Sequence, residues 1–135
     1  MVAQSLARLA LFADLTPEAL EAFTTVAREE TFPEGEWVLR EGAENCGLHV
    51  ILDGEAGVVV GGIERFTLHA GMYFGEISAL LGDPVGASVF ARSRLHCSII
   101  ESEDLFPFLL ANPSVTLRLL QAETRRLSDT NLWLA

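Results

Sequence analysis

Short apolar runs, separated by turn residues at intervals of roughly ten residues, fill the middle of the chain and constrain its fold more than any other feature. Glycine occurs in most of the intervening turns, where its missing side chain permits tight backbone geometry. Residues 53–55 and 61–62 are expected to close hairpins. Short strands at this spacing predict an antiparallel sandwich or barrel. The predicted strands lie at 37–39, 48–52, 56–60, 65–68, 87–91 and 95–100.

Helical patterns precede this region. The apolar positions over residues 6–12 predict a short helix. Thr16-Pro17 marks the start of a second helix, because threonine is a good N-cap and proline at the first helical position loses no hydrogen bond. Apolar residues then recur at helical spacing up to Ala27. The change to a strand-like period at Thr31 predicts that residues 1–30 form N-terminal helices.

Two further helices are predicted after the strands. Asp104 is expected to cap a short helix that holds Pro107 in its first turn, the position where proline is tolerated. Asn112-Pro113 begins a final helix, expected to run to about Asn131. The seven-residue spacing of its leucines leaves two alternatives open, packing on the β region or a dimer seam. The apolar side of this helix consists of Leu117, Leu119, Leu120 and Leu127, followed by Leu134 beyond it.

Residues 74–89 are the candidate functional segment. The segment passes through Gly75 into helix-compatible residues, breaks at Gly82-Asp83-Pro84 and becomes strand-like again at Ala87. A helix that follows a glycine presents free backbone N–H groups, which bind anions and phosphate above all. Glu76 is placed to accept hydrogen bonds from sugar hydroxyls. A strand–turn–helix linker without a ligand explains the same residues, so the pattern alone leaves both interpretations open.

This segment resembles the phosphate-binding cassette of cyclic nucleotide-binding domains, the family of protein kinase A regulatory subunits, the catabolite activator protein and cyclic nucleotide-gated channels. Residues 35–42 and 50–55 resemble two further signatures of that family. The resemblance extends over the whole chain. The cassette positions that match the family pattern are Phe74, Gly75, Glu76, Ile77, Leu81, Gly82, Pro84, Ala87, Ser88 and Val89.

The resemblance implies a mainly β fold with flanking helices. The expected architecture is one domain over residues 1–135, an antiparallel, jelly-roll-like β-roll at 31–101 with the cassette at 74–89. A C-terminal segment at 102–135 would contain the lid helix. The resemblance also implies relations to haem and iron–sulfur sensors, but the cysteine clusters that those groups need are absent from the sequence.

The resemblance assigns a role to each matching site residue. Glu76 would hold the ribose 2′-hydroxyl of cAMP or cGMP, and Ala87 and Ser88 would lie against the phosphate or the base. Thr130 and Asn131, near the end of the lid helix, fall where relatives contact the adenine edge; a frayed, solvated helix end is the simpler explanation of both. The backbone groups that would face the cyclic phosphate belong to Gly75, Ile77 and Ser78.

One position departs from the family pattern. Val85 stands where the family has the arginine that pairs with the cyclic phosphate. A substitute cation is sought among the arginines of neighbouring strands and turns, although a surface role explains each of them. These are Arg40, Arg65, Arg92 and Arg94.

Composition narrows the function classes. The net charge of −10, with nine arginines and no lysine, argues against binding DNA. No apolar run reaches the roughly 18 residues that a membrane span needs, and no secretory signal is evident. Cys46 and Cys97 form neither a disulfide framework nor a metal pattern with the three histidines, which favours a cytoplasmic protein with reduced thiols. No catalytic fingerprint occurs, so an enzyme is not expected.

Three hypotheses follow. The first is a regulatory sensor module that binds cAMP or cGMP as a ligand and needs no cofactor, with binding weakened by Val85. The second is a nucleotide-independent module for a protein partner or a homodimer. The third is a pocket for another small ligand, neutral or less anionic, which Val85 and the acidic charge would suit better.

Overall fold

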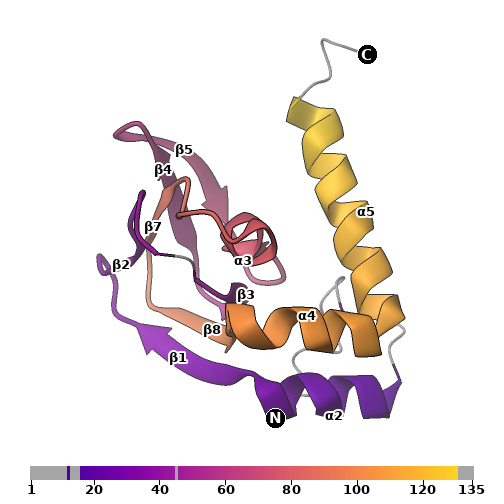
Figure 1. Ribbon diagram of the computed structural model, residues 1–135. Coiled ribbons are helices and arrows are strands. Elements are labelled where there is room, and N and C mark those ends of the chain that lie inside the picture. Colours follow the sequence, from indigo (N-terminus) through magenta and orange to yellow (C-terminus); the bar gives the residue numbers. More distant parts are fainter. Residues whose placement is uncertain (1–11, 13–15, 45, 131–135) are drawn as a thin grey trace.

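The computed structural model describes residues 12, 16–44 and 46–130, with the side chain of Thr130 outside the description. Its strands form two four-stranded antiparallel sheets that are flanked by helices (Figure 1). This arrangement confirms the predicted mainly β fold with an antiparallel β-roll. One sheet has the order β1 (Arg28–Phe32), β8 (Leu95–Ile100), β3 (Leu48–Asp53) and β6 (Tyr73–Phe74). The other has the order β2 (Trp37–Leu39), β7 (Ser88–Ala91), β4 (Ala56–Val60) and β5 (Ile63–Leu68).

The strand region begins earlier than predicted. Strand β1 starts at Arg28, inside the segment assigned to N-terminal helices, and pairs with β8 from Arg28–Ile99 to Phe32–Leu95. Its sequence gave no apolar alternation, because the positions before Phe32 carry polar side chains that remain exposed or half-buried. The boundary at Thr31 was therefore wrong, since pairing with β8 rather than apolar patterning defines this strand.

The two glycine turns behave differently. Residues 53–55 do not close a hairpin, because β3 and β4 belong to different sheets and the chain crosses between them there. Gly54 has a φ of 92°, and a Cβ at this position would lie 2.1 Å from the carbonyl oxygen of Arg94, so the crossing requires glycine. The hairpin predicted at Gly61-Gly62 is confirmed: it joins β4 to β5, with Val60 opposite Ile63.

The helices confirm the predicted caps in part. Helix α2 (Pro17–Val26) is capped as expected, since Thr16 Oγ1 accepts the N–H of Ala19 at 3.1 Å. Helix α4 (Ser102–Ala111) begins before the predicted cap at Asp104 and holds Pro107 in its interior. The prediction that Pro107 must lie in a first turn was wrong. Burial of the apolar side chains on either side of it offsets the missing backbone hydrogen bond.

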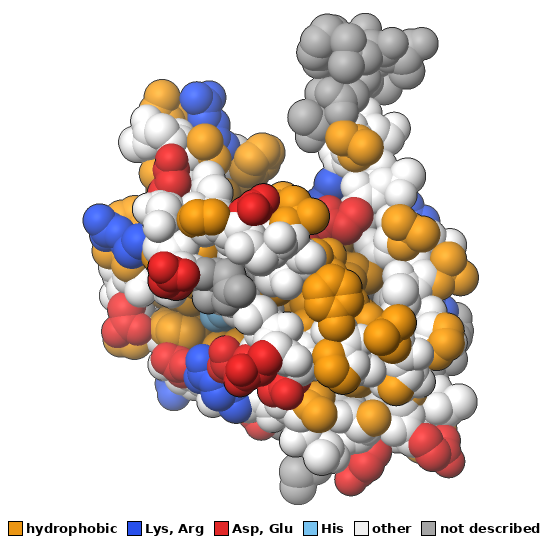
Figure 2. All heavy atoms as spheres, viewed as in Figure 1, with side chains coloured by type: hydrophobic (Ala, Val, Ile, Leu, Met, Phe, Trp, Pro, Cys, Tyr) orange, Lys and Arg blue, Asp and Glu red, His pale blue; other side chains and the backbone are white. Residues whose placement is uncertain are grey.

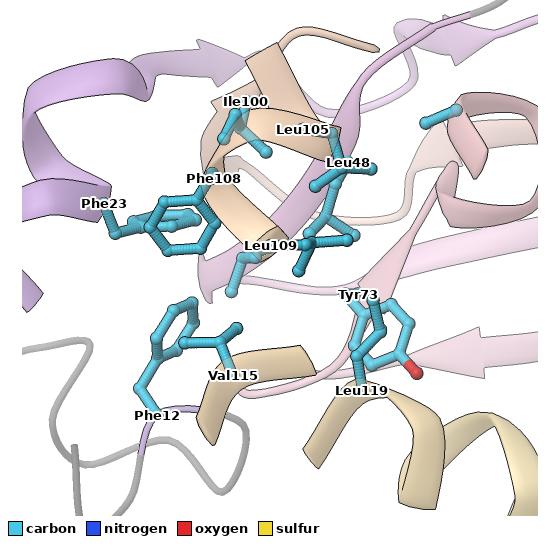
Figure 3. Close-up of a cluster of buried hydrophobic side chains, with 12 residues drawn as sticks. Phe12, Phe23, Leu48, Tyr73, Ile100, Leu105, Phe108, Leu109, Val115 and Leu119 are labelled. Carbon is cyan, nitrogen blue, oxygen red and sulfur yellow. The ribbon is translucent and has the colours of Figure 1, made fainter. Parts of the chain in front are cut away.

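Two apolar cores hold these elements together. One lies between the sheets and includes Phe32, Ile51 and Leu95. The other joins α2, α4 and α5 (Pro113–Thr130) to β3 and β6. In this second core the rings of Phe12, Phe23 and Phe108 meet edge to face, as Figure 3 shows. Phe12 is the described part of the helix predicted over residues 6–12; the rest of that segment lies outside the described residues.

Helix α5 buries one narrow stripe. Val115 and Leu119 are buried in the core, whereas Leu117, Leu120 and Leu127 are exposed, so most of the predicted apolar side faces outward. Figure 2 shows apolar side chains gathered along this part of the molecule. Leu134, the third leucine of the seven-residue spacing, lies outside the described residues. Among the helices of the described segments, none is both long and apolar enough to cross a membrane.

Candidate ligand-binding site

The cassette is a sharp turn from β6 into the short helix α3 (Glu76–Leu81). Gly75 makes this turn with a φ of 85°, in the left-handed region that favours glycine. A Cβ at Gly75 would lie 2.5 Å from the carbonyl oxygen of Gly47 and 3.1 Å from Cys46 Sγ. Both the backbone conformation and the close approach of the preceding loop therefore require glycine here.

A neutral histidine supports the cassette from behind. His49 is buried and stacks on the ring of Phe74, with centroids 4.7 Å apart. Burial lowers the pKa of His49 to about 4, so the ring is neutral near pH 7. Its Nδ1 lies 3.0 Å from the carbonyl oxygen of Gly47, which accepts hydrogen bonds only, so Nδ1 carries the proton. The wall behind Gly75 is therefore rigid and uncharged.

Side chains of the cassette also hold its own shape. Ser78 Oγ donates to the carbonyl oxygen of Asp83 at 2.6 Å, which closes the turn after α3. Ser88 Oγ accepts the backbone N–H of Glu41 at 2.8 Å. Val85 is buried, with 6% of its surface exposed. Its N–H donates to Ala43 and its carbonyl accepts from Gly42, so the turn before β3 covers the end of the cassette.

Glu76 is buried against the final helix. It is 4% exposed, and its Oε2 lies 2.9 Å from Nη1 of Arg126 on α5. Arg126 also donates from Nη2 to the carbonyl oxygen of Tyr73 at 2.9 Å, and its guanidinium lies 4.1 Å from the centre of the Tyr73 ring. One arginine thus ties α5 to both β6 and α3.

A second carboxylate lies at the same junction. Glu123, one turn before Arg126 on α5, places its Oε1 3.9 Å from the same Nη1 atom. Burial, and after it the neighbouring Glu123, raise the pKa of Glu76 to about 8, against the opposing effect of Arg126. Burial also raises the pKa of the Tyr73 hydroxyl above its ordinary value. The junction therefore favours a protonated carboxyl near neutral pH.

The structure brings the predicted site residues together unevenly. Gly75, Glu76 and Ser78 lie at the start of α3, and the side chain of Ile77 is exposed beside them. Ala87 and Ser88, both half-buried, follow at the start of β7. Thr130 ends α5, but its side chain and all of Asn131 lie outside the described residues.

The cation that pairs with Glu76 is Arg126, which is not one of the four arginines proposed from the sequence. Arg92 pairs with Glu64 on β5, and Arg40 lies over the ring of Trp37, 4.5 Å from its centre. Arg94 lines a separate cavity of about 170 Å³ with Thr31, Asp53 and His96. Sequence reasoning missed Arg126, because nothing in the local sequence distinguishes it from Arg125 beside it.

Comparisons with known proteins identify the family of the chain. The family model described as the cyclic nucleotide-binding domain matches residues 29–112. The chain belongs to the cyclic nucleotide-binding domain family. This confirms the resemblance drawn from the cassette residues, and it places the chain among domains that are typically regulatory modules.

Relatives within this family include channels and kinases. The human potassium/sodium hyperpolarization-activated cyclic nucleotide-gated channel 1 is 34% identical over 93 residues, which are 69% of this chain. The cGMP-dependent protein kinase of Toxoplasma gondii is 32% identical over 100 residues, which are 74% of this chain. Each alignment covers 10% of the relative, so the chain spans about a tenth of the length of these proteins.

A solved member of the family has the same fold. The catabolite activator protein of Thermus thermophilus superposes with a TM-score of 0.83 at 26% sequence identity. The match covers 93% of this chain and 61% of that one. The helices that precede and follow the strands along the chain therefore belong to the shared architecture.

Proposed function

We propose that this chain is a regulatory sensor domain that binds cAMP or cGMP in its cassette and responds by repositioning α5. One observation carries the proposal: the carboxylate predicted to hold the ribose is bonded to the helix predicted to be the lid. In this proposal residues 1–135 act as one domain in the cytoplasm. The chain itself has no catalytic activity, requires no cofactor and binds neither DNA nor a membrane.

The remaining cassette contacts complete the proposed site. The backbone of Gly75, Ile77 and Ser78 would face the phosphate, and Ala87 with Ser88 would border the phosphate or the base. A ribose hydroxyl that donates to Glu76 would have to share this carboxylate with Arg126 or displace it. A ligand shifts a conformational equilibrium only when its contacts differ between the two states. Competition between the ribose and Arg126 for Glu76 would supply that difference, because it weakens the attachment of α5.

Affinity should be lower than in relatives that keep the cassette arginine. A hydrogen bond to a charged group contributes about 1.5–3 kcal/mol net, and a bidentate arginine–phosphate pair lies toward the strong end. Val85 makes no such bond, which corresponds to binding weaker by about ten- to a few hundred-fold. Arg126 lies close enough to the cassette to supply part of the missing charge if it leaves Glu76.

Isothermal titration calorimetry with cAMP and then cGMP tests this function. We expect binding that is lost in Glu76→Ala and strengthened in Val85→Arg. Glu103→Ala, which removes an exposed glutamate from α4, is the matched control and should bind as the wild type does. No heat with either nucleotide up to millimolar concentration, in the wild type and in Val85→Arg, would exclude the proposal.

A second candidate function is a nucleotide-independent interaction module. The observation that favours it is the buried Val85, packed under the 42–43 turn where the family places a phosphate-binding arginine. The exposed leucines of α5 would then contact a protein partner or a second copy. Sedimentation equilibrium distinguishes a second copy from a different protein partner. A chain that stays monomeric at high concentration, with or without cAMP or cGMP, would exclude the homodimer.

A third candidate keeps the pocket but changes its ligand. A neutral or less anionic molecule would not need the cation that Val85 removes, and it would suit the net charge of −10. Titration with adenosine beside cAMP distinguishes it, because this candidate alone predicts that the uncharged nucleoside binds at least as tightly.

A further inference from the structure

Two glutamates meet one arginine where the cassette touches α5. Arg126 Nη1 lies 2.9 Å from Glu76 Oε2 and 3.9 Å from Glu123 Oε1. Glu76 is almost completely buried, and the side chain of Arg126 is 37% exposed. Two ionised carboxylates at this point would carry one negative charge more than Arg126 can balance.

Two polar atoms at the junction lack hydrogen-bond partners within the described residues. They are Glu123 Oε1 and the hydroxyl oxygen of Tyr73, both fully buried. Figure 3 shows the Tyr73 ring beside Leu119 of α5. A buried oxygen without a donor is costly, and more so when it is charged. The Tyr73 hydroxyl can itself donate toward Glu123, so a proton on one carboxyl chiefly removes the surplus negative charge.

We propose that Glu76 and Glu123 share one proton, and that this proton holds α5 against the cassette. When the proton leaves for bulk water, the two carboxylates repel each other across the junction between α3 and α5, and the attachment of α5 weakens. The importance of this latch for signalling rests on the proposed function, since α5 is the proposed lid; the latch itself does not depend on a nucleotide.

The groups around Glu76 support this assignment from each neighbouring element. Arg126 and Glu123 face it from α5, and Tyr73 from β6. Cys46, from the loop before β3, has a pKa raised by burial, so it brings no negative charge near pH 7. The pKa of Glu76, raised to about 8 chiefly by burial, is consistent with a proton retained at neutral pH.

Carboxyl carbon NMR on the full chain, without nucleotide, tests the shared proton. In the wild type we expect the Glu76 carboxyl to titrate with a pKa of about 8. Glu123→Gln should lower the midpoint of Glu76 by at least about one pH unit, because the amide removes a charge and donates a hydrogen bond. Glu103→Gln, on the exposed side of α4, is the control and should leave it unchanged.

Hydrogen exchange of the α5 amides, corrected for the intrinsic rate at each pH, tests the latch. Protection should fall between pH 6 and pH 9 in the wild type and stay level in Glu123→Gln. The proposal is overturned if Glu76 of the wild type titrates in the ordinary acid range, or if protection is the same function of pH in both proteins. Failure of nucleotide binding would leave these results unaffected, so the two proposals fail separately.

Discussion

Behind Gly75 the cassette rests on the backbone of Gly47 and the neutral ring of His49, whereas on the α5 side it meets Glu76 and Arg126. The rear contacts are short, buried and hydrogen-bonded. The front contacts include buried oxygens without partners and a carboxyl with a strongly raised pKa. Fully satisfied polar groups make a region rigid, and incompletely satisfied ones mark where a structure can change.

The two sides of this turn therefore have different roles: one fixes the position of α3, and the other binds α5. A rigid wall behind Gly75 fixes the direction of α3, so that Glu76 is always presented at the same place. The charged front then has a well-defined surface against which α5 can bind or release. A variant on one side of the cassette should leave the other side intact.

The largest effect is expected from Gly75→Ala. The new Cβ would lie 2.5 Å from a backbone oxygen at a φ of 85°, so both strain and a clash that cannot relax cheaply should lower the free energy of unfolding by about 2–4 kcal/mol. Urea unfolding measures it. Gly82→Ala is the matched control at the other end of α3: its φ is 74° but no atom lies within 4 Å, so it should cost about 1 kcal/mol. Equal losses in both variants would show that the rear wall is not rigid.

His49 should make the rear wall sensitive to acid. Its pKa is about 4 in the folded chain and ordinarily 6.5, so the unfolded chain binds the extra proton and stability falls as pH drops below 6.5 toward 4. The loss between pH 7.5 and pH 5 should be about 2 kcal/mol. Glu76 has the opposite slope, since its raised pKa costs stability as pH rises from 4.5 toward 8.

Variants separate the contributions of His49 and Glu76 to the pH dependence of stability. In the Glu76→Gln background, urea unfolding at several pH values should show the acid loss of His49 alone, and adding His49→Gln should flatten it. A flat profile already present in Glu76→Gln would mean that His49 is protonated in the folded chain and that the rear wall is not neutral.

On the front side, Arg126→Ala should leave Glu76 buried without its cation. Because the Arg126 side chain is partly exposed, solvent reduces the expected loss to about 1–2 kcal/mol, and the pKa of Glu76 should rise further without the opposing cation. Faster hydrogen exchange in α5 than in β3 would locate the effect at the junction. Arg125→Ala, an exposed neighbour on the same helix, should change neither quantity measurably.

The sequence predicted the cassette and the β-roll well because both depend on local signals. Gly75 and the hairpin at Gly61-Gly62 are required by turn geometry that shows in the sequence itself. Residues 53–55 were predicted to close a hairpin, but they carry the chain from one sheet to the other at Gly54. The same turn residues suit a hairpin and a crossing, and only the pairing of β3 and β4 distinguishes the two. Strand β1 was missed because its polar residues face outward along β8.

The junction with α5 was harder to predict for a physical reason. Glu76 and Arg126 are 50 positions apart, and an arginine on a helix looks the same whether it faces solvent or a carboxylate. Arg126 can be assigned a role only once tertiary packing has placed α5 against β6. Glu123 is still less visible, since an acidic residue in so acidic a chain carries no signal until its neighbours are known.

The smallest effect separates the two faces of α5. Leu127→Ser removes an exposed side chain and should change the free energy of unfolding by no more than about 0.5 kcal/mol. Leu119→Ala, in the core beside Tyr73, should cost about 2–4 kcal/mol, because it leaves a cavity where α5 is anchored. If Leu127→Ser instead costs as much as Leu119→Ala, and the loss depends on protein concentration, then the outer face of α5 is covered by a second copy. In that case α5 would be restrained from both sides, and release of Arg126 alone could not move it.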